Sequence, residues 1–370
     1  MIIKIILIAV NALCLIAFIV CLSVSASLKT PLRSQQAAAA WAGQSGERFS
    51  QLSVFFPESS EFDVDRVRSL HPILDDALLG ASLESTPGRT LYTDAWSTET
   101  KVSIVSQRGS AEAIAIAVGG DFFMFHPLYL RDGSYLSPND LMKDRVILDE
   151  ELAWRLFGAA RLEGFEVLID NKTFIIAGVV SRESDFASLK AYDHGAGLYM
   201  SFDALVAMNE ENEEDVYIST YEIVMPDPIT GFALNILTEA IPDSSVHIIE
   251  NTSRFSLSNI FSIIGSFGER SMRSEAIAYP YWENAARFTE DWLALLLLLS
   301  LLFIAFPVVS AVIYGIKVIR YMIKHGKGAI KKMITRKDKR DYEKYKLEHG
   351  EDFDAYSANS IVREYRDEIY

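Results

Sequence analysis

Few of the chain's reactive side chains stand at a spacing that supports chemistry. Gly326-Lys327-Gly328 lacks the upstream glycine and the hydroxyl of a phosphate-binding loop. Gly43-Gln44-Ser45-Gly46 lacks the spacing that exposes a nucleophile above a sheet. The histidines show no HExxH or other ligand spacing; they are His71, His126, His194, His247, His325 and His349. We therefore expect no catalytic residues, no cofactor and no metal site.

Two further groups of residues favour structural roles. The acidic run from Glu210 to Asp215 lacks the alternating ligands and central glycine of a calcium loop, so we interpret it as a solvated loop. The pair Gly119 and Gly120 before Asp121 indicates a bend or close backbone packing rather than a phosphate turn. The aromatic residues that follow, Phe122 and Phe123, are typical of a core.

Two uncharged apolar runs are the elements that would position any functional residues of the chain. The first covers residues 5–28 and the second residues 293–316. Each has about 24 residues and would be about 36 Å long as a helix, which is enough to cross a bilayer. We expect transmembrane helices at 5–28 and 292–316. The first run could instead be a signal peptide, because Val24-Ser25-Ala26 resembles a cleavage site.

The charges that flank the second run predict its orientation, because Lys and Arg are retained on the cytoplasmic side. Glu290 and Asp291 precede the run, whereas the segment after it is basic as far as Arg340. We therefore expect residues 1–4 and the tail 317–370 in the cytoplasm and the central part outside, at the cell membrane. Candidate residues for the membrane interface or for partner docking are Tyr281, Trp282, Trp292, Arg320, Lys324, Lys331 and Lys332.

Composition narrows the class of the exported part. The 370-residue chain has a formal net charge of −15, and its tail is basic, so the exported part is acidic. An acidic domain is a poor binder of nucleic acid. Cys14 and Cys21 are the only cysteines, and both lie in the first apolar run, so no disulfide can staple the exported domain.

Two local patterns indicate the fold of the exported part. DRVILDEELAWRLFG, residues 144–158, predicts a short strand, a helix capped by Asp149 and a left-handed end at Gly158. GFEVLIDNKTFIIAGVV, residues 164–180, predicts a hairpin with its turn at Asp170-Asn171-Lys172. A strand, a capped helix and a hairpin in succession favour an α+β domain between two transmembrane α-helices.

Together with GGDFFMFHPLYLRDGSYL (residues 119–136), these segments resemble the signature of the MacB-like periplasmic core domain of ABC-transporter permeases. The resemblance assigns residues 29–229 to that core domain and residues 230–291 to a juxtamembrane stalk. The family-motif residues, with structural roles, are Gly120, Asp121, Phe122, Phe123, Leu152, Ala153, Leu156, Phe157, Gly158, Gly164, Gly178 and Val179.

The resemblance also implies partners and a function. The resemblance implies a permease that acts as a dimer and is driven by a cytoplasmic ABC ATPase. The family's permease module continues after the second helix, but no run between Ile316 and Tyr370 is long and apolar enough to span. We therefore expect an ABC ATPase, a permease chain that supplies the missing helices, and a homodimer. The expected function is a non-ATPase membrane subunit of an export or mechanotransmission system. The alternatives are a cell-surface binding or sensory protein and an anchored hydrolase.

Two segments near the membrane keep alternative interpretations. Leu257, Ile260, Phe261 and Ile264 recur at helical spacing, which predicts an apolar face on a stalk at the membrane or on a collar that docks a partner. The basic segment after residue 316 predicts a helix that binds anionic lipid or presents a docking surface to the ATPase.

Overall fold

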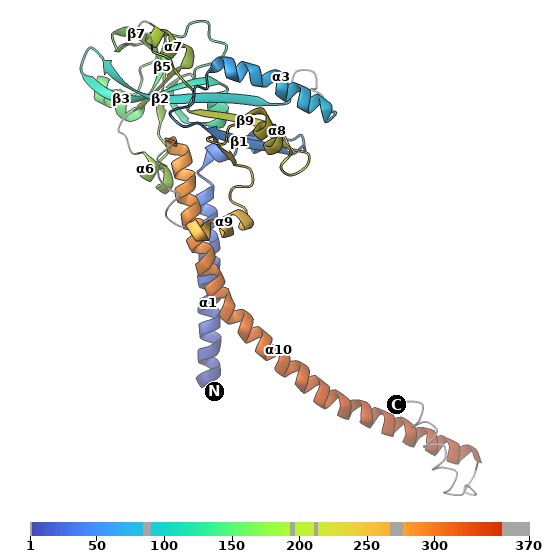
Figure 1. Ribbon diagram of the computed structural model, residues 1–370. Helices are drawn as coiled ribbons and strands as arrows, with labels where there is room; N and C mark the ends of the chain where they lie inside the picture. Colours follow the sequence, from blue (N-terminus) through green and yellow to red (C-terminus); the bar gives the residue numbers. More distant parts are fainter. Residues whose placement is uncertain (1, 84–89, 193–196, 211–213, 267–276, 350–370) are drawn as a thin grey trace. The chain divides into compact units, whose positions relative to one another are not determined.

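The structure is a computed structural model that describes residues 2–83, 90–192, 197–210, 214–266 and 277–349. It divides into two compact units, Met1–Ile16 with Leu302–Tyr370 and Ala17–Leu301. The second unit contains every strand described below, and Figure 1 labels its main elements.

Within the described residues, ten strands form one mixed sheet in the order β10-β1-β9-β2-β3-β8-β5-β7-β4, with β6 pairing β2 and β7. The neighbours are antiparallel except β3 with β8 and β5 with β7, which are parallel. The strands are β1 (Phe49–Phe55), β2 (Thr93–Val105), β3 (Ser110–Gly120), β4 (Tyr129–Gly133), β5 (Arg145–Asp149), β6 (Glu166–Ile169), β7 (Lys172–Ser181), β8 (Gly197–Ser201), β9 (Thr220–Pro226) and β10 (His247–Glu250).

Helices cover both faces of the sheet. The larger core joins one face to α3 (Val64–Gly80), α5 (Glu150–Phe157), α7 (Phe202–Asn209) and α8 (Phe232–Ala240). The second core joins the other face to α2 (Ala37–Ala42), α4 (Phe122–Phe125) and the start of α10 (Tyr281–His349). Every residue of β1 and β9 is buried, as expected for strands covered on both faces. The remaining elements are α1 (Ile2–Lys29), η1 (Arg33–Gln35), α6 (Phe186–Ala191), α9 (Leu257–Ile263) and η3 (Ile264–Ser266).

The capped helix predicted after residue 149 is confirmed. The Asp149 carboxylate accepts a hydrogen bond of 2.6 Å from the Leu152 amide, and α5 ends at Gly158 with φ of 68°. Leu152 and Leu156 are both fully buried on the face that meets the sheet. A short helix with a good cap at each end therefore positions this part of the core.

The predicted hairpin is also confirmed. β6 and β7 pair in antiparallel register around Asp170 and Asn171, which have φ of 46° and 67°. Asn and Asp tolerate the left-handed region that such a two-residue turn requires. The fold class is the expected mixture of helices and strands.

The boundary expected at residue 229 is wrong, because the sheet continues beyond it. β10 pairs with β1 from His247↔Phe55 to Glu250↔Leu52, and α8 packs in the larger core. Residues 230–250 therefore belong to the domain. A four-residue strand at the sheet edge has too little periodicity to be recognised from its sequence.

Among the described residues, α1 and the stretch Tyr281–Lys324 of α10 are long and apolar enough to cross a membrane, judged by length and composition. The two predicted spans lie within these helices. Pro307 does not interrupt α10, which continues as a helix through the basic segment to His349.

Candidate functional site

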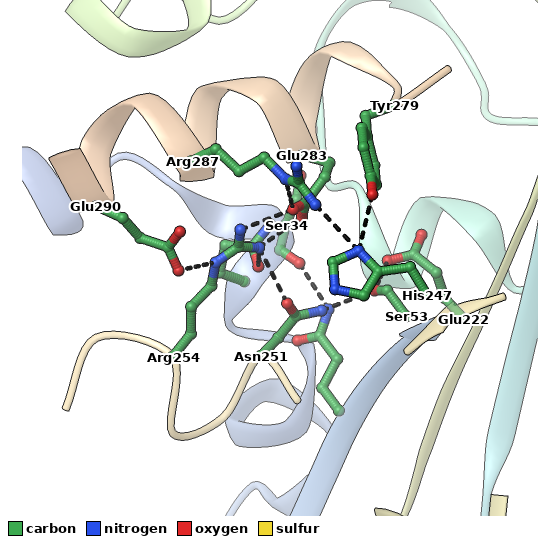
Figure 2. A network of polar contacts seen from close by, with 12 residues as sticks. Ser34, Ser53, Glu222, His247, Asn251, Arg254, Tyr279, Glu283, Arg287 and Glu290 are labelled. Atoms are coloured by element: carbon green, nitrogen blue, oxygen red, sulfur yellow. Dashed lines mark hydrogen bonds and ion pairs between the residues drawn. The ribbon is translucent and has the colours of Figure 1, made fainter. Parts of the chain in front are cut away.

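The first turns of α10 carry a group of charged side chains that the fold buries completely. Arg254, in the loop after β10, is 2% exposed and reaches two carboxylates of α10. Its Nη1 and Nη2 donate hydrogen bonds of 2.5 and 2.8 Å to the two carboxylate oxygens of Glu283, and its Nε donates one of 2.7 Å to Glu290. We call Asn251, Arg254, Glu283, Arg287 and Glu290 the ionic junction (Figure 2).

Arg287 completes the charge pairing on α10. Its Nε donates to Glu283 Oε1 over 2.7 Å, one helical turn away, and its guanidinium carbon lies 3.6 Å from the ring centre of Tyr279. Its Nη2 lies 3.1 Å from Nδ1 of His247, which also lies 2.8 Å from the Tyr279 hydroxyl. Through Arg287 and His247, the second turn of α10 therefore contacts the edge strand β10.

A chain of polar contacts leads from the ionic junction into the middle of the sheet. Asn251 lies 3.2 Å from Arg254 Nη1 and donates to the Ser53 hydroxyl over 2.7 Å. Ser53 on β1 donates to Glu222 on β9 over 2.8 Å. Glu222 contacts His126, whose ring lies 4.3 Å from that of Trp282. This path of polar contacts thus begins and ends on α10 and passes through β1 and β9, the two fully buried strands.

A second set of contacts ties the ionic junction to the segment that follows α1. Arg254 Nη1 donates to Gln35 Oε1 of η1 over 3.3 Å. Gln51 on β1 donates to the Ser34 carbonyl over 2.7 Å and accepts from the Ala37 amide over 2.9 Å. The segment that follows α1 is therefore joined to β1 directly, and α10 is joined to the same strand through Arg254 and Asn251.

The electrostatics of the ionic junction follow from burial. Burial alone lowers the pKa of Arg254, but the carboxylates of Glu283 and Glu290 outweigh this effect and hold that pKa above its usual value. A buried ion pair contributes little net stability, yet removal of one partner leaves an uncompensated charge in a low dielectric. Separation of Arg254 from Glu283 or Glu290 would therefore be energetically costly.

A further group of polar side chains joins α10 to the helix predicted from the sequence. Tyr281 donates to Glu183, and the neighbouring Arg182 lies 2.5 Å from Asp149, the cap of α5. Tyr192 also donates to Glu183 and stacks on Tyr281 with ring centres 4.3 Å apart. Burial raises the pKa of Asp149, while Arg182 and the Leu152 and Gly197 amides oppose the rise.

The predicted family-motif residues include buried side chains and glycines with restricted backbone surroundings. The side chains of Leu152, Ala153, Leu156 and Val179 are fully buried, and those of Phe122 and Phe157 nearly so. Phe123 is half-buried beside Tyr135 and Tyr199, and Thr93 donates to Asp121. Gly120, Gly158 and Gly164 have positive φ, and a Cβ at Gly178 would lie 2.8 Å from backbone oxygens. The close packing predicted at Gly119 and Gly120 is confirmed, because a Cβ at Gly120 would lie 2.4 Å from the Asp94 carbonyl oxygen.

The predicted membrane-interface residues divide into separate groups. Tyr281 and Trp282 are 8% and 4% exposed and pack in the second core, so their expected place at the headgroups is wrong. Their bulk fills the space between α10 and α4, which an isolated sequence does not reveal. Trp292 is 38% exposed, and Arg320 and Lys324 are exposed. The side chains of Lys331 and Lys332, residues 211–213 of the acidic run, His194 and the tail from residue 350 lie outside the described part.

The sequence prediction missed the ionic junction. One signal was available, because Glu283, Arg287 and Glu290 recur at a spacing that places them on one helix face. Their partner Arg254 lies 29 to 36 positions away, a separation that no local pattern connects. Within the described residues, no group of three or more His, Cys, Asp or Glu is placed to hold a metal ion.

The chain is similar to one protein family and, at low identity, to several solved structures. The family model described as the MacB-like periplasmic core domain matches residues 8–246. The chain is similar to the periplasmic region of MacB from Actinobacillus actinomycetemcomitans, with 15% identity over 55% of this chain and 89% of that one and a TM-score of 0.41. It is also similar to the extracellular domain of the noncanonic ABC-type transporter YknZ from Gram-positive bacteria, with 13% identity over 54% and 99% of the chains and a TM-score of 0.34. No curated protein matches it significantly.

Proposed function

The chain belongs to the family of the MacB-like periplasmic core domain, and from this premise we propose that it is a non-ATPase membrane subunit of an ABC-type export or mechanotransmission system. The family domain is that of ABC-transporter-type permeases, so the chain is a membrane protein with an N-terminal apolar helix and a periplasmic-type domain. In this proposal an ABC ATPase and a permease chain are its partners, and two copies act together.

The proposed topology places the sheet on the extracytoplasmic side of the cell membrane and the end of α10 in the cytoplasm. It is supported by the basic residues that follow the second apolar run, including the exposed Arg320 and Lys324. The basic part of α10 then lies at the inner leaflet, where each Lys or Arg near anionic lipid contributes about 1 kcal/mol to binding. The same segment is available to a cytoplasmic partner.

The single observation that supports the transmission of motion is that Arg254 is hydrogen-bonded to both Glu283 and Glu290 of α10. A tilt or a shift of α10 moves both carboxylates, and Arg254 must follow because a separated buried pair is costly. Asn251 and Ser53 then connect this displacement to β1 and β9. The sheet thereby receives motion that begins in the membrane.

Crosslinking in native membranes tests this function. A photo-crosslinking amino acid replaces Arg320 in one tagged variant and Lys324 in another, and Lys101, exposed on β2, serves as the matched control position. We expect mild solubilisation and mass spectrometry to identify an ABC ATPase from the α10 positions only. A helix-rich permease chain should be recovered with it. Recovery of neither chain from either α10 position would contradict the proposal and favour the surface-binding alternative.

A further inference from the structure

Helix α9 packs against α10 at the start of the second apolar run rather than against the sheet. Ile260 and Ile263 of α9 form a buried cluster with Leu293 and Ala294, and Leu297 lies at its margin. Figure 1 shows α9 beside α10, below the sheet. Because α9 contacts the first residues of the run, its depth relative to a bilayer is the depth at which that run enters.

The other face of α9 is apolar and uncovered. Leu257 and Phe261, one helical turn apart, are 76% and 62% exposed. The apolar face predicted from the sequence is therefore divided, with Ile260 turned to α10 and these two side chains turned away from it. Exposure of two such side chains to water on a seven-residue helix is unfavourable, which indicates an apolar environment.

The polar groups of α9 are compatible with that environment. Asn259 donates to the Ser253 carbonyl over 3.0 Å, and Ser262 donates to the Asn259 carbonyl over 2.7 Å. Ser256 accepts from the Asn259 amide and caps the helix. No charged residue occurs from Phe255 to Phe267. The helix can therefore leave bulk water without stranding a charge or these side-chain donors.

Helix α6 also has exposed apolar side chains, and it packs against the residues of α10 that precede the second apolar run. The Phe186 ring lies 5.3 Å from that of Phe288 and 5.9 Å from that of Trp292. Leu189, on the same short helix, is 62% exposed, and Lys190 follows it near the helix end. An exposed Trp with a basic neighbour is typical of the membrane–water interface.

We propose that α9 and α6 insert their uncovered side chains into the outer leaflet of the phospholipid bilayer. Leu257 and Phe261 of α9 reach the boundary between headgroups and acyl chains, and Phe186 and Leu189 of α6 lie at the headgroups. Lipid is the expected occupant because α9 packs on Leu293 and Ala294, at the start of the run that is proposed to enter the bilayer. This inference rests on the proposed crossing of α10 and is independent of any ATPase or permease partner.

Spin labelling of the full chain in phosphatidylcholine–phosphatidylglycerol vesicles tests the proposal. The natural cysteines are removed by Cys14→Ser and Cys21→Ala, and single cysteines are introduced as Leu257→Cys, Phe261→Cys and Leu189→Cys. Leu141→Cys is the matched control, because Leu141 is an apolar residue that is 98% exposed on a sheet-side loop. Val312→Cys, within the apolar run, serves as the depth reference.

We expect the ratio of oxygen to nickel-chelate accessibility at positions 257 and 261 to be several-fold higher than at position 141. Position 189 should have an intermediate ratio. A nickel-accessible label at 257 and 261 with an oxygen-accessible label at 312 would overturn this inference and leave α10 in the membrane. Low accessibility of 257 and 261 to both reagents would overturn it in favour of a second copy. A nickel-accessible label at 312 would overturn both the inference and the proposed topology.

Discussion

At the scale of single residues, Arg254 contributes most to the joint between sheet and helix. Its guanidinium contacts Glu283, Glu290, Gln35 and Asn251, which come from three separate segments. Arginine suits this position because its planar fork pairs with a carboxylate through two parallel hydrogen bonds. A lysine could neutralise the same charges but could not hold several segments in a fixed geometry.

Replacement of Arg254 by methionine should destabilise the sheet-containing unit. We expect Arg254→Met to lower the free energy of unfolding by about 3–5 kcal/mol, because Glu283 and Glu290 both lose their buried ion pair with Arg254. Urea unfolding of the full chain in detergent, followed by tryptophan fluorescence, measures the change.

Two comparisons separate the buried charge from a general effect of arginine loss. Arg68→Met removes an exposed pair with Asp65 and should change the free energy by less than about 1 kcal/mol. The double variant Arg254→Met/Glu290→Met should recover part of the loss, because it also removes a buried carboxylate that has lost the charge of Arg254. Equal losses in Arg254→Met and Arg68→Met would refute the role of burial.

His71 gives a dependence of stability on pH. Its hydrogen bond to Asp94 raises its pKa above 6.5, burial opposes the rise, and the charges of Asp94 and Asp75 add to it. The contribution of the pair is therefore fully present below pH 6.5 and is lost as the pH rises through the higher folded pKa. His71 is partly exposed, so the effect should be less than about 1 kcal/mol.

The measurement is the melting temperature of the wild type and of His71→Gln at several pH values. The wild type should exceed the variant by more at about pH 6 than at about pH 9. A difference that grows with pH would show that the protonated pair does not stabilise the fold.

At the scale of elements, close backbone approach connects β3 to β2 at the start of the family motif. Gly120 has φ of 62°, its Cβ position lies 2.4 Å from the Asp94 carbonyl oxygen, and the Asp121 amide donates to that oxygen over 2.9 Å. We expect Gly120→Ala to lower the free energy of unfolding by roughly 1–3 kcal/mol, through backbone strain and the clash. Gly80→Ala is the matched control, because its Cβ would enter open space in α3. It should raise the stability by about 0.4–1 kcal/mol. The same urea titration measures both, and similar effects of the two substitutions would contradict the geometry.

Elements whose bounds are determined by residues close together in the sequence could be predicted. Asp149 and Gly158 mark the two ends of α5 by local capping, and Asp170-Asn171 specifies the hairpin by its tolerance of positive φ. The position of Tyr281 and Trp282 could not be predicted in this way. Aromatic rings that precede an apolar run suit a headgroup layer and a protein core equally well, and only the packing of α4 and the sheet decides between them. The pairing of Arg254 with α10 likewise depends on tertiary packing and could not be predicted from neighbouring residues.

At the scale of the whole molecule, two helices of suitable length and composition adjoin one domain among the described residues. Hydrogen bonds join η1 directly to β1, and a path from Glu283 through Arg254 and Asn251 to Ser53 joins α10 to the same strand. An acidic central part and a basic segment after residue 316 are consistent with the proposal that these two parts face different compartments. In the proposed function, work done on the helices in the membrane thus reaches the sheet-containing domain.

The most direct test of this account is the labelling of single cysteines in intact cells by a membrane-impermeant maleimide. In a background of Cys14→Ser and Cys21→Ala, Lys101→Cys reports on the sheet and Arg336→Cys on the basic part of α10, and both natural side chains are exposed. We expect the label to reach position 101 in intact cells and position 336 only after lysis. Labelling of position 336, with protection of position 101, in intact cells would contradict the proposed topology and the transmission of motion that depends on it.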